Sequence, residues 1–248
     1  MGMPVDPLTE LETVGAVRGS LRSGGGGWIV TPNLDQLRLL SGHPELEGIF
    51  TAATLIVPDG MPLVWASRLQ RTPLPERVAG SDLVWSLAAV AEREGTGLFL
   101  LGGDPGVAES AADELRRHHP GLRIVGTHCP PQGFEQDPHE LAEIDARLGA
   151  SDARLVYVAL GFPKQELLIA GLRSTFPAIW FLGCGISLSF IAGNVRRAPR
   201  WMRVSGLEWA HRLSQEPGRL AKRYLIHDIP FVIRLFAAAL RRGVSGTP

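Results

Sequence analysis

The stretch Leu155-Val-Tyr-Val-Ala-Leu160, followed at once by Gly161-Phe-Pro-Lys-Gln-Glu166, has the pattern that decides the fold. Such a short apolar run is typical of a buried parallel strand, and the glycine and proline after it indicate a turn into a helix. Five further apolar runs with the same surroundings are Trp28–Thr31, Ala53–Val57, Leu98–Leu101, Leu122–Val125 and Ala178–Leu182. Six strand-then-helix units predict an α/β protein with a Rossmann-like, mostly parallel sheet and helices on both faces.

Parallel strands place their carboxyl ends along one edge of the sheet, where ligands bind in open α/β folds. The segments expected at this edge are Thr31, Pro58-Asp59-Gly60, Gly102-Gly103-Asp104, Gly161-Phe162-Pro163 and Gly183-Cys184-Gly185. Two helix starts are predicted from an aspartate N-cap followed by proline: Asp104-Pro105 before Val107–His119, and Asp137-Pro138 before Glu140–Leu148.

The 248 residues carry 25 basic and 25 acidic side chains, but the charges are unevenly distributed. Residues 196–248 contain eleven Lys/Arg and three Asp/Glu, a balance of +8 that leaves the remainder at −8. The strand–helix alternation also stops after Gly193. We therefore predict a catalytic core over residues 1–194 and a basic helical appendage over residues 195–248. The zero net charge argues against a nucleic-acid partner, whereas the basic segment favours another anionic partner.

The sequence shows no signal for export. Met1–Arg22 lacks a continuous apolar run, which predicts a cytoplasmic protein, and Cys129 and Cys184 are expected to be free thiols. Ser174–Val195 is uncharged and long enough to span a bilayer, but its proline and glycines favour a buried strand, a turn and a short helix.

Thr31-Pro-Asn33 and Pro58-Asp59-Gly60 follow two consecutive predicted strands. Together they would bring a hydroxyl, an amide and a carboxylate to one site, which suits Asp59 as a general base that orients a substrate hydroxyl. The alternative is structural: Asp59-Gly60 is only a turn, and Asn33 caps the helix that follows.

Two other turns could bind substrate. Gly102-Gly103 before a helix could hold a phosphate or ribose, or could serve only a tight strand-to-helix turn. Gln165 and Glu166 could face the cleft and bind sugar hydroxyls, or Glu166 could simply complement the helix dipole. The dinucleotide fingerprint and the Walker A sequence are absent from the sequence, and no carboxylate pair suggests a catalytic metal.

The basic segment offers two further functions. Arg212, Arg219 and Arg223 would share a face of one continuous helix and could neutralise a diphosphate, although Pro217 makes that continuity doubtful. An apolar stripe from Phe231 to Ala239, with arginines beside it, could lie on an anionic membrane or pack against the core.

Seven motifs occur in order: Thr31-x-Asn33, Pro58-Asp59-Gly60, Glu76-Arg77-Val-x-Gly80, Leu101-Gly102-Gly103, Gly161-x-Pro163-Lys164-Gln165-Glu166, Gly193 with Arg197-Ala-Pro199, and Gly206-Leu-Glu208-Trp209 with Arg212. In this set the chain resembles the WecG/TagA/CpsF glycosyltransferase family over roughly residues 28–226. The resemblance implies an inverting, metal-independent enzyme that needs no cofactor. It would transfer a sugar from a UDP-sugar to a polyprenyl-diphosphate-linked sugar, with an appendage that closes the site and contacts the membrane.

The resemblance also implies residue roles. Asp59 would be the base, Thr31 a substrate-orienting neighbour and Gln165 a cleft residue, while Arg212, Arg219 and Lys222 or Arg223 would bind the donor diphosphate. The full set of predicted substrate-binding residues is Asn33, Arg77, Gly80, Gly102, Gly103, Pro163, Gln165, Glu166, Arg197, Arg212, Arg219, Lys222 and Arg223.

Two departures from the family pattern, Leu188-Ser189-Phe190 and Pro62, leave the donor open among N-acetylmannosamine, glucuronate and glucose types. The partners expected are a UDP-sugar, a lipid-diphosphate-linked acceptor, the inner face of the cell membrane and a possible second copy of the chain. Two alternatives are a non-catalytic nucleotide-sugar or membrane-binding module and a dinucleotide-dependent oxidoreductase.

Overall fold

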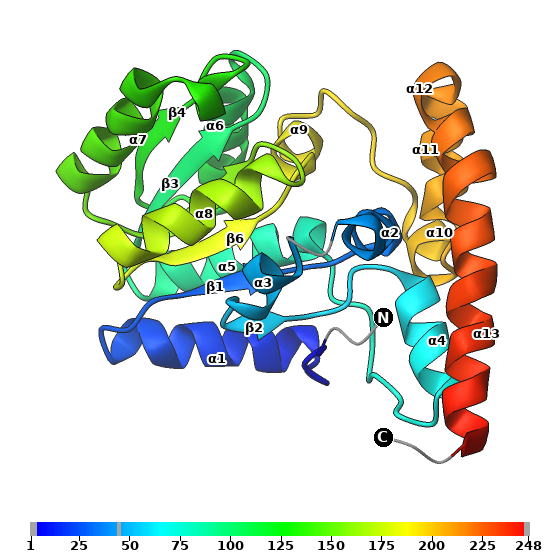
Figure 1. Ribbon diagram of the computed structural model, residues 1–248. Helices are drawn as coiled ribbons and strands as arrows, with labels where there is room; N and C mark the ends of the chain where they lie inside the picture. The colour runs from blue at the N-terminus through cyan, green and yellow to red at the C-terminus, as the bar shows by residue number, and fades with distance from the viewer. Residues whose placement is uncertain (1–3, 44–45, 246–248) are drawn as a thin grey trace.

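The computed structural model describes residues 4–43 and 46–245. One sheet of six strands has the order β2-β1-β6-β5-β3-β4, and every neighbouring pair is parallel (Figure 1). The strands are β1 (Gly27–Val30), β2 (Leu55–Ile56), β3 (Gly97–Gly102), β4 (Ile124–His128), β5 (Ala153–Ala159) and β6 (Trp180–Gly183). A strand therefore forms at each of the six predicted runs, although β2 is shorter than expected and β4 lies further along the chain.

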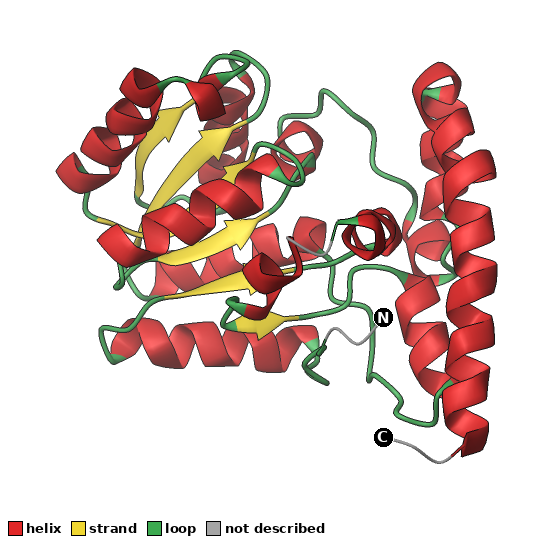
Figure 2. Cartoon of the chain, in the orientation of Figure 1, coloured by secondary structure: helices red, strands yellow, loops and turns green. Residues whose placement is uncertain are grey.

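Helices cover both faces of the sheet, as predicted (Figure 2). The helices whose apolar side chains pack on one face are α1 (Glu10–Arg22), α5 (Gly80–Arg93), α6 (Val107–His118) and α9 (Ser187–Ile191). Those on the other face are α2 (Leu34–Gly42), α3 (Glu47–Thr51), α7 (Pro138–Ala150) and α8 (Lys164–Thr175), together with the 3-10 helix η2 (Phe134–Gln136). Ile29 packs on the first face, while Trp28 and Val30 pack on the second. Because both faces are covered, the central strands are mostly apolar, whereas the edge strand β4 is half-buried and ends in Thr127-His128.

The two predicted helix starts have different outcomes. Asp137 caps α7 by accepting from the backbone N–H of His139, with Pro138 at the first helical position, as predicted. The prediction of Asp104 as the cap of α6 was wrong, because Gly106 is the N-cap and has a φ of 82°. Asp104 instead accepts a hydrogen bond from Val107 through its backbone carbonyl, within the turn that precedes the helix.

After α9 the described chain forms helices and no strands. These are α10 (Arg200–Val204), α11 (Glu208–Gln215), α12 (Pro217–Ala221), the π-helical segment η3 (Lys222–Asp228) and α13 (Ile229–Ser245). Arg212 and Arg223 do not lie on one continuous helix, because α11 ends at Gln215 and a new helix begins at Pro217. The boundary near Asn194 stays a prediction; below, "the appendage" means residues 195–245.

The appendage helices stand beside the sheet, and the core helix α4 (Met61–Leu69) packs along α13 (Figure 1). Gly243 allows this close approach, because a Cβ there would collide with the backbone carbonyl of Leu69. Helix α2 also lies between β1 and the appendage. Across the described residues, no helix has the length and apolarity needed to cross a membrane. Ser174–Val195 instead contains β6, a turn and α9, as predicted.

Candidate active site

A cavity of about 670 Å³ lies between the carboxyl ends of the strands and the appendage. Thr31 follows β1, Asp59 follows β2 and Gly183 ends β6, and all three line the cavity. The chain leaves β1 toward α3 on one face of the sheet and leaves β6 toward α9 on the other. Ligands bind at such a crevice between neighbouring strands in open α/β folds.

Asp59 is held by two backbone contacts and approached by Thr31. Its N–H donates to the carbonyl of Pro32 over 3.0 Å, and its carboxylate accepts from the N–H of Gly80, the first residue of α5. A Cβ on Gly80 would lie 3.1 Å from the hydroxyl oxygen of Thr31, a tight contact that would push this hydroxyl aside by a few tenths of an ångström. The predicted meeting of Thr31 and Asp59 at one edge is therefore present, with Gly80 between them.

The Asp59 carboxylate has an altered proton affinity. Its pKa is raised from 3.8 to about 6, mainly by burial and to a smaller extent by the like charges of Glu208 and Asp82. The positive charge of Arg77 and the hydrogen bond from Gly80 act in the opposite direction. A carboxylate with a pKa of about 6 is ionised at neutral pH and is a stronger base than an exposed aspartate.

Asn33 performs the capping role that was the alternative to substrate binding. Its Oδ1 accepts from the N–H groups of Asp35 and Gln36, each at 3.1 Å, while Gln36 accepts from the N–H of Asn33. The side chain also lines the cavity. Its oxygen therefore serves α2, which leaves the amide nitrogen as the group available to a ligand.

Gln165 lines the cavity, but its side chain connects two strand-end loops. Its Oε1 accepts from the N–H of Gly161 after β5 and from the N–H of Gly185 after β6, at 3.2 and 3.1 Å. Its Nε2 donates to Oε1 of Glu166 over 2.8 Å. Glu166 is buried away from the cavity, and its Oε2 has no hydrogen-bond partner. Burial raises the pKa of Glu166 to about 7.

Several predicted site residues lie outside the cavity lining. They are Gly102, Gly103, Pro163, Glu166, Arg197 and Lys222. A Cβ on Gly102 would lie 2.6 Å from the carbonyl oxygen of Ala159, which supports the tight-turn interpretation of the paired glycines. The side chain of Arg219 lies outside the described part of the structure. Arg77, Gly80, Arg212 and Arg223 do line the cavity.

A network of ion pairs joins the core to the appendage beside Asp59. Asp82 of α5 accepts two hydrogen bonds from Arg197, at 2.7 and 2.8 Å, and one from Arg203 at 3.0 Å. Arg77 of the core contacts Asp82 at 3.3 Å and Glu208 of α11 at 3.0 Å. Bidentate arginine–carboxylate pairs fix orientation as well as charge, so this network sets the position of α10 and α11.

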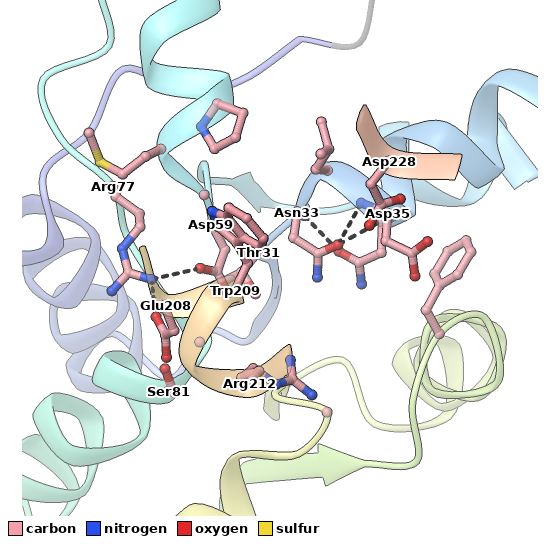
Figure 3. A pocket seen from close by; sticks show the side chains of 18 of the residues that line it. Thr31, Asn33, Asp35, Asp59, Arg77, Ser81, Glu208, Trp209, Arg212 and Asp228 are labelled. Atoms are coloured by element: carbon pink, nitrogen blue, oxygen red, sulfur yellow. Dashed lines mark hydrogen bonds and ion pairs between the residues drawn. The ribbon is translucent and has the colours of Figure 1, made fainter. Parts of the chain in front are cut away.

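A second network holds η3 against α2. Arg38 pairs with Asp35 at 2.6 Å and with Asp228 at 3.2 Å, while Arg223 lies 3.3 and 3.5 Å from the same two carboxylates. Arg212 differs, because the described residues include no ion-pair partner for it. Its buried Nε lacks a hydrogen bond, as do those of Arg197, Arg203 and Arg223. Figure 3 shows Arg212 in the same cavity as Asp59, Glu208 and Trp209.

Sequence reasoning missed the acidic members of both networks, which are Asp35, Asp82, Glu208 and Asp228. Glu208 belongs to the Gly206-Leu-Glu208-Trp209 motif but had no predicted role, and Asp82 lies two residues after Gly80 of another motif. Their positions in or next to these motifs were the only sign in the sequence that they belong to the site. Within the described ranges, no group of His, Cys, Asp and Glu side chains is placed to hold a metal ion.

Comparison with known proteins adds two findings. Residues 1–245 match the model of the Glycosyl transferase WecG/TagA/CpsF family. An N-acetylglucosaminyldiphosphoundecaprenol N-acetyl-beta-D-mannosaminyltransferase of Bacillus spizizenii is 34% identical over 194 residues, which is 78% of this chain and 73% of the relative.

Glu166 predicts a pH-dependent stability. Because its folded pKa of about 7 exceeds its ordinary value of 4.5, its favourable contribution is complete below about pH 4.5 and is lost as the pH rises through about 7. Ionisation of Glu166 is expected to cost roughly 3 kcal/mol at pH 8. We expect Glu166→Gln to remove this part of the pH dependence, measured as the free energy of unfolding between pH 4.5 and 8. If the free energies of unfolding of wild type and Glu166→Gln change in parallel with pH, Glu166 is not the source of this pH dependence. The same measurement on Asp59→Asn gives the part of the pH dependence that comes from Asp59.

Proposed function

The chain belongs to the WecG/TagA/CpsF family of glycosyl transferases, and we propose that it transfers an N-acetylmannosamine-type sugar from UDP to a polyprenyl-diphosphate-linked N-acetylglucosamine. The name of the Bacillus relative supports this acceptor and this donor sugar over glucose or glucuronate. The product would serve the synthesis of a cell-surface polysaccharide or a teichoic-acid-like polymer. The observation that carries the proposal is the Asp59 carboxylate beside Thr31 in the cavity, with arginines of the appendage opposite.

We propose direct displacement as the mechanism. Asp59 removes the proton from the acceptor hydroxyl, whose oxygen attacks the anomeric carbon while the bond to UDP breaks, so the configuration inverts. Thr31 orients the attacking hydroxyl from the adjacent strand end. A base whose pKa lies near the working pH suits this step, and holding both substrates in one cavity supplies the remaining positioning.

The leaving diphosphate needs cations, and Arg212 is the best candidate among the described side chains. It lines the cavity without an ion-pair partner, whereas Arg223 already contacts Asp35 and Asp228. If Arg223 bound the diphosphate, it would have to give up its contacts with the carboxylates of Asp35 and Asp228. Arg219 and Lys222 stay predictions, and we assign Arg197 to holding the appendage rather than the substrate.

We further propose that the appendage rests on the inner face of the membrane. The predicted stripe from Phe231 to Ala239 packs inward, with Phe231 and Ala239 buried, so it is not the face that would meet a membrane. The exposed apolar side chains of η3 and α13 are instead Leu225, Ile226, Ile229, Ile233, Leu240 and Val244. The side chains of Arg234 and Arg241 are also exposed on α13. An exposed apolar face flanked by arginines matches the composition of a helix that lies on an anionic bilayer. A polyprenyl-linked acceptor is itself held in the membrane, so this placement would bring the cavity to its substrate.

Asp59→Asn should lower turnover by roughly 100- to 10,000-fold with little change in UDP binding, because it removes the base but keeps the shape. The measurement is a transfer assay with a panel of UDP-sugars and a short-chain prenyl-diphosphate-GlcNAc acceptor, with products identified by mass. Asp113→Asn, a change on the exposed side of α6, is the matched control.

Two outcomes of this assay would overturn parts of the proposal. Turnover by Asp59→Asn close to that of Asp113→Asn would remove Asp59 as the base. UDP binding by calorimetry without transfer of any sugar would favour the non-catalytic module, whereas bound nicotinamide absorbance would favour an oxidoreductase.

Arg212→Gln should weaken UDP-sugar binding by roughly ten- to a hundredfold, the usual effect of losing a charged hydrogen bond to phosphate. Calorimetric titration with UDP and with uridine separates the diphosphate contribution, since only UDP binding should fall. Arg200→Gln, an exposed arginine at the start of α10, controls for the loss of one charge. Equal UDP affinities in the two variants would exclude Arg212 from the diphosphate site.

The double variant Leu240→Glu and Val244→Glu should reduce cosedimentation with anionic phospholipid vesicles, since it places two negative charges on the apolar face. These side chains are 49% and 82% exposed, so folding should be retained. Leu11→Glu on α1, 81% exposed, is the matched control. Unchanged vesicle binding would contradict membrane docking, and a mass change in analytical ultracentrifugation would assign the face to a second copy of the chain.

A further inference from the structure

One nitrogen of Arg77 serves two carboxylates that come from different parts of the chain. Nη1 lies 3.0 Å from Oε2 of Glu208 on α11 and 3.4 Å from Oδ1 of Asp59 after β2 (Figure 3). Nη2 of the same guanidinium lies 3.3 Å from Asp82. The shorter contact is therefore with the appendage, and Asp59 has the longest of the three.

A second arginine of the same network lies close to Glu208. Glu208 stands in the first turn of α11, and its second oxygen lies 3.8 Å from Nε of Arg197. Arg197 is in turn bound to Asp82 and to the carbonyl and hydroxyl of Ser81, at distances of 2.7 to 3.1 Å. The two arginines and Asp82 thus form a frame that holds the Glu208 carboxylate against Arg77.

Because Asp59, Asp82 and Glu208 share the guanidinium of Arg77, each carboxylate is stabilised less than it would be alone. A guanidinium bonded to a single carboxylate stabilises its ionised form, whereas a guanidinium already bonded to Glu208 and Asp82 stabilises a third carboxylate less. Glu208 also repels the charge of Asp59 directly. Both effects make Asp59 hold its proton more strongly.

We propose that Glu208 is a positioning residue of the transfer reaction, which makes Asp59 a stronger base by competing with it for the guanidinium of Arg77. The inference rests on the proposed role of Asp59 as the proton acceptor. It adds that the base is completed by the appendage, because Glu208 comes from α11. A core without its docked appendage would pair Arg77 with Asp59 more closely and would leave a weaker base.

The test measures Asp59 itself. The charged groups that face it are Arg77 from the segment before α5, Asp82 from α5 and Glu208 from α11, with Arg212 of α11 in the same cavity. Full-length protein with ¹³C-labelled aspartate carboxyls is titrated by NMR, and Asp59→Asn identifies the Asp59 signal. Glu208→Gln keeps the shape and removes the charge, whereas Glu208→Asp keeps the charge. Glu143→Gln on α7 removes an equivalent charge far from the site.

Glu208→Gln should lower the titration midpoint of Asp59 by roughly one pH unit. Glu208→Asp, which keeps the charge on a side chain one methylene shorter, should lower it less, and Glu143→Gln should not shift it. A midpoint in Glu208→Gln equal to that of Glu143→Gln would overturn the inference. The other aspartate signals report in the same spectra whether each variant is folded.

The acidic limb of kcat/KM against pH then separates this inference from the proposed function. If Asp59 is the base, the limb shifts to lower pH in Glu208→Gln by the same amount as the NMR midpoint. A shifted midpoint with an unshifted limb would keep the effect of Glu208 on Asp59 but would remove Asp59 as the catalytic base. A merely structural Glu208 would lower turnover at every pH and move neither value.

Discussion

The Asp82 carboxylate binds two arginines of the appendage, and the position of the appendage over the cavity depends on this contact. Asp82 lies in the first turn of α5, whose first residue, Gly80, also donates to Asp59. One helix start therefore positions both the proposed base and the segment that covers it. Removing a single member of such a half-buried network leaves the other charges uncompensated, which costs more than the pairs contribute together. This explains how a short acidic side chain can fix the placement of α10 and α11.

The charge asymmetry of the sequence has a different meaning in the folded chain. The basic appendage faces an acidic core, and several of its cations are used at their junction: Arg197 and Arg203 by Asp82, and Arg223 by Asp35. The net charge of +8 in the appendage sequence therefore overstates the positive charge that an anionic partner could contact. Arg212 is the cavity cation that the described residues leave unpaired, which concentrates the proposed recognition of diphosphate on one side chain. Arg234 and Arg241 of α13 are exposed outside this junction, which suits the proposed contact with an anionic membrane surface.

The fold could be predicted because most strands are buried on both faces, so they appear in the sequence as short, mostly apolar runs. The half-buried edge strand β4, whose predicted run contains Arg123, begins later than predicted. The meeting of Thr31 with Asp59 could also be predicted, since parallel strands end at one edge. The start of α6 was mispredicted, because Asp104-Pro105 has the composition of a helix cap while the left-handed Gly106 delays the helix. The ion pairs could not be predicted at all: Asp82 and Arg197 are 115 residues apart, and neither residue type indicates its partner. The same holds for Gln165, whose amide connects two loops through backbone groups that every sequence contains.

Asp59 and Glu166 both lie in segments that follow strands and both have raised pKa values, and their surroundings decide which of the two can act on a substrate. Burial dominates both shifts, so proton affinity alone does not distinguish Asp59 from Glu166. Glu166 faces away from the cavity and has an amide as its partner, so changing its protonation affects folding energy but reaches no ligand. Asp59 lines the cavity and is surrounded by charges that the appendage can alter. A buried carboxylate becomes a base for catalysis only where a substrate can reach it and where neighbouring charges adjust its proton affinity to the working pH.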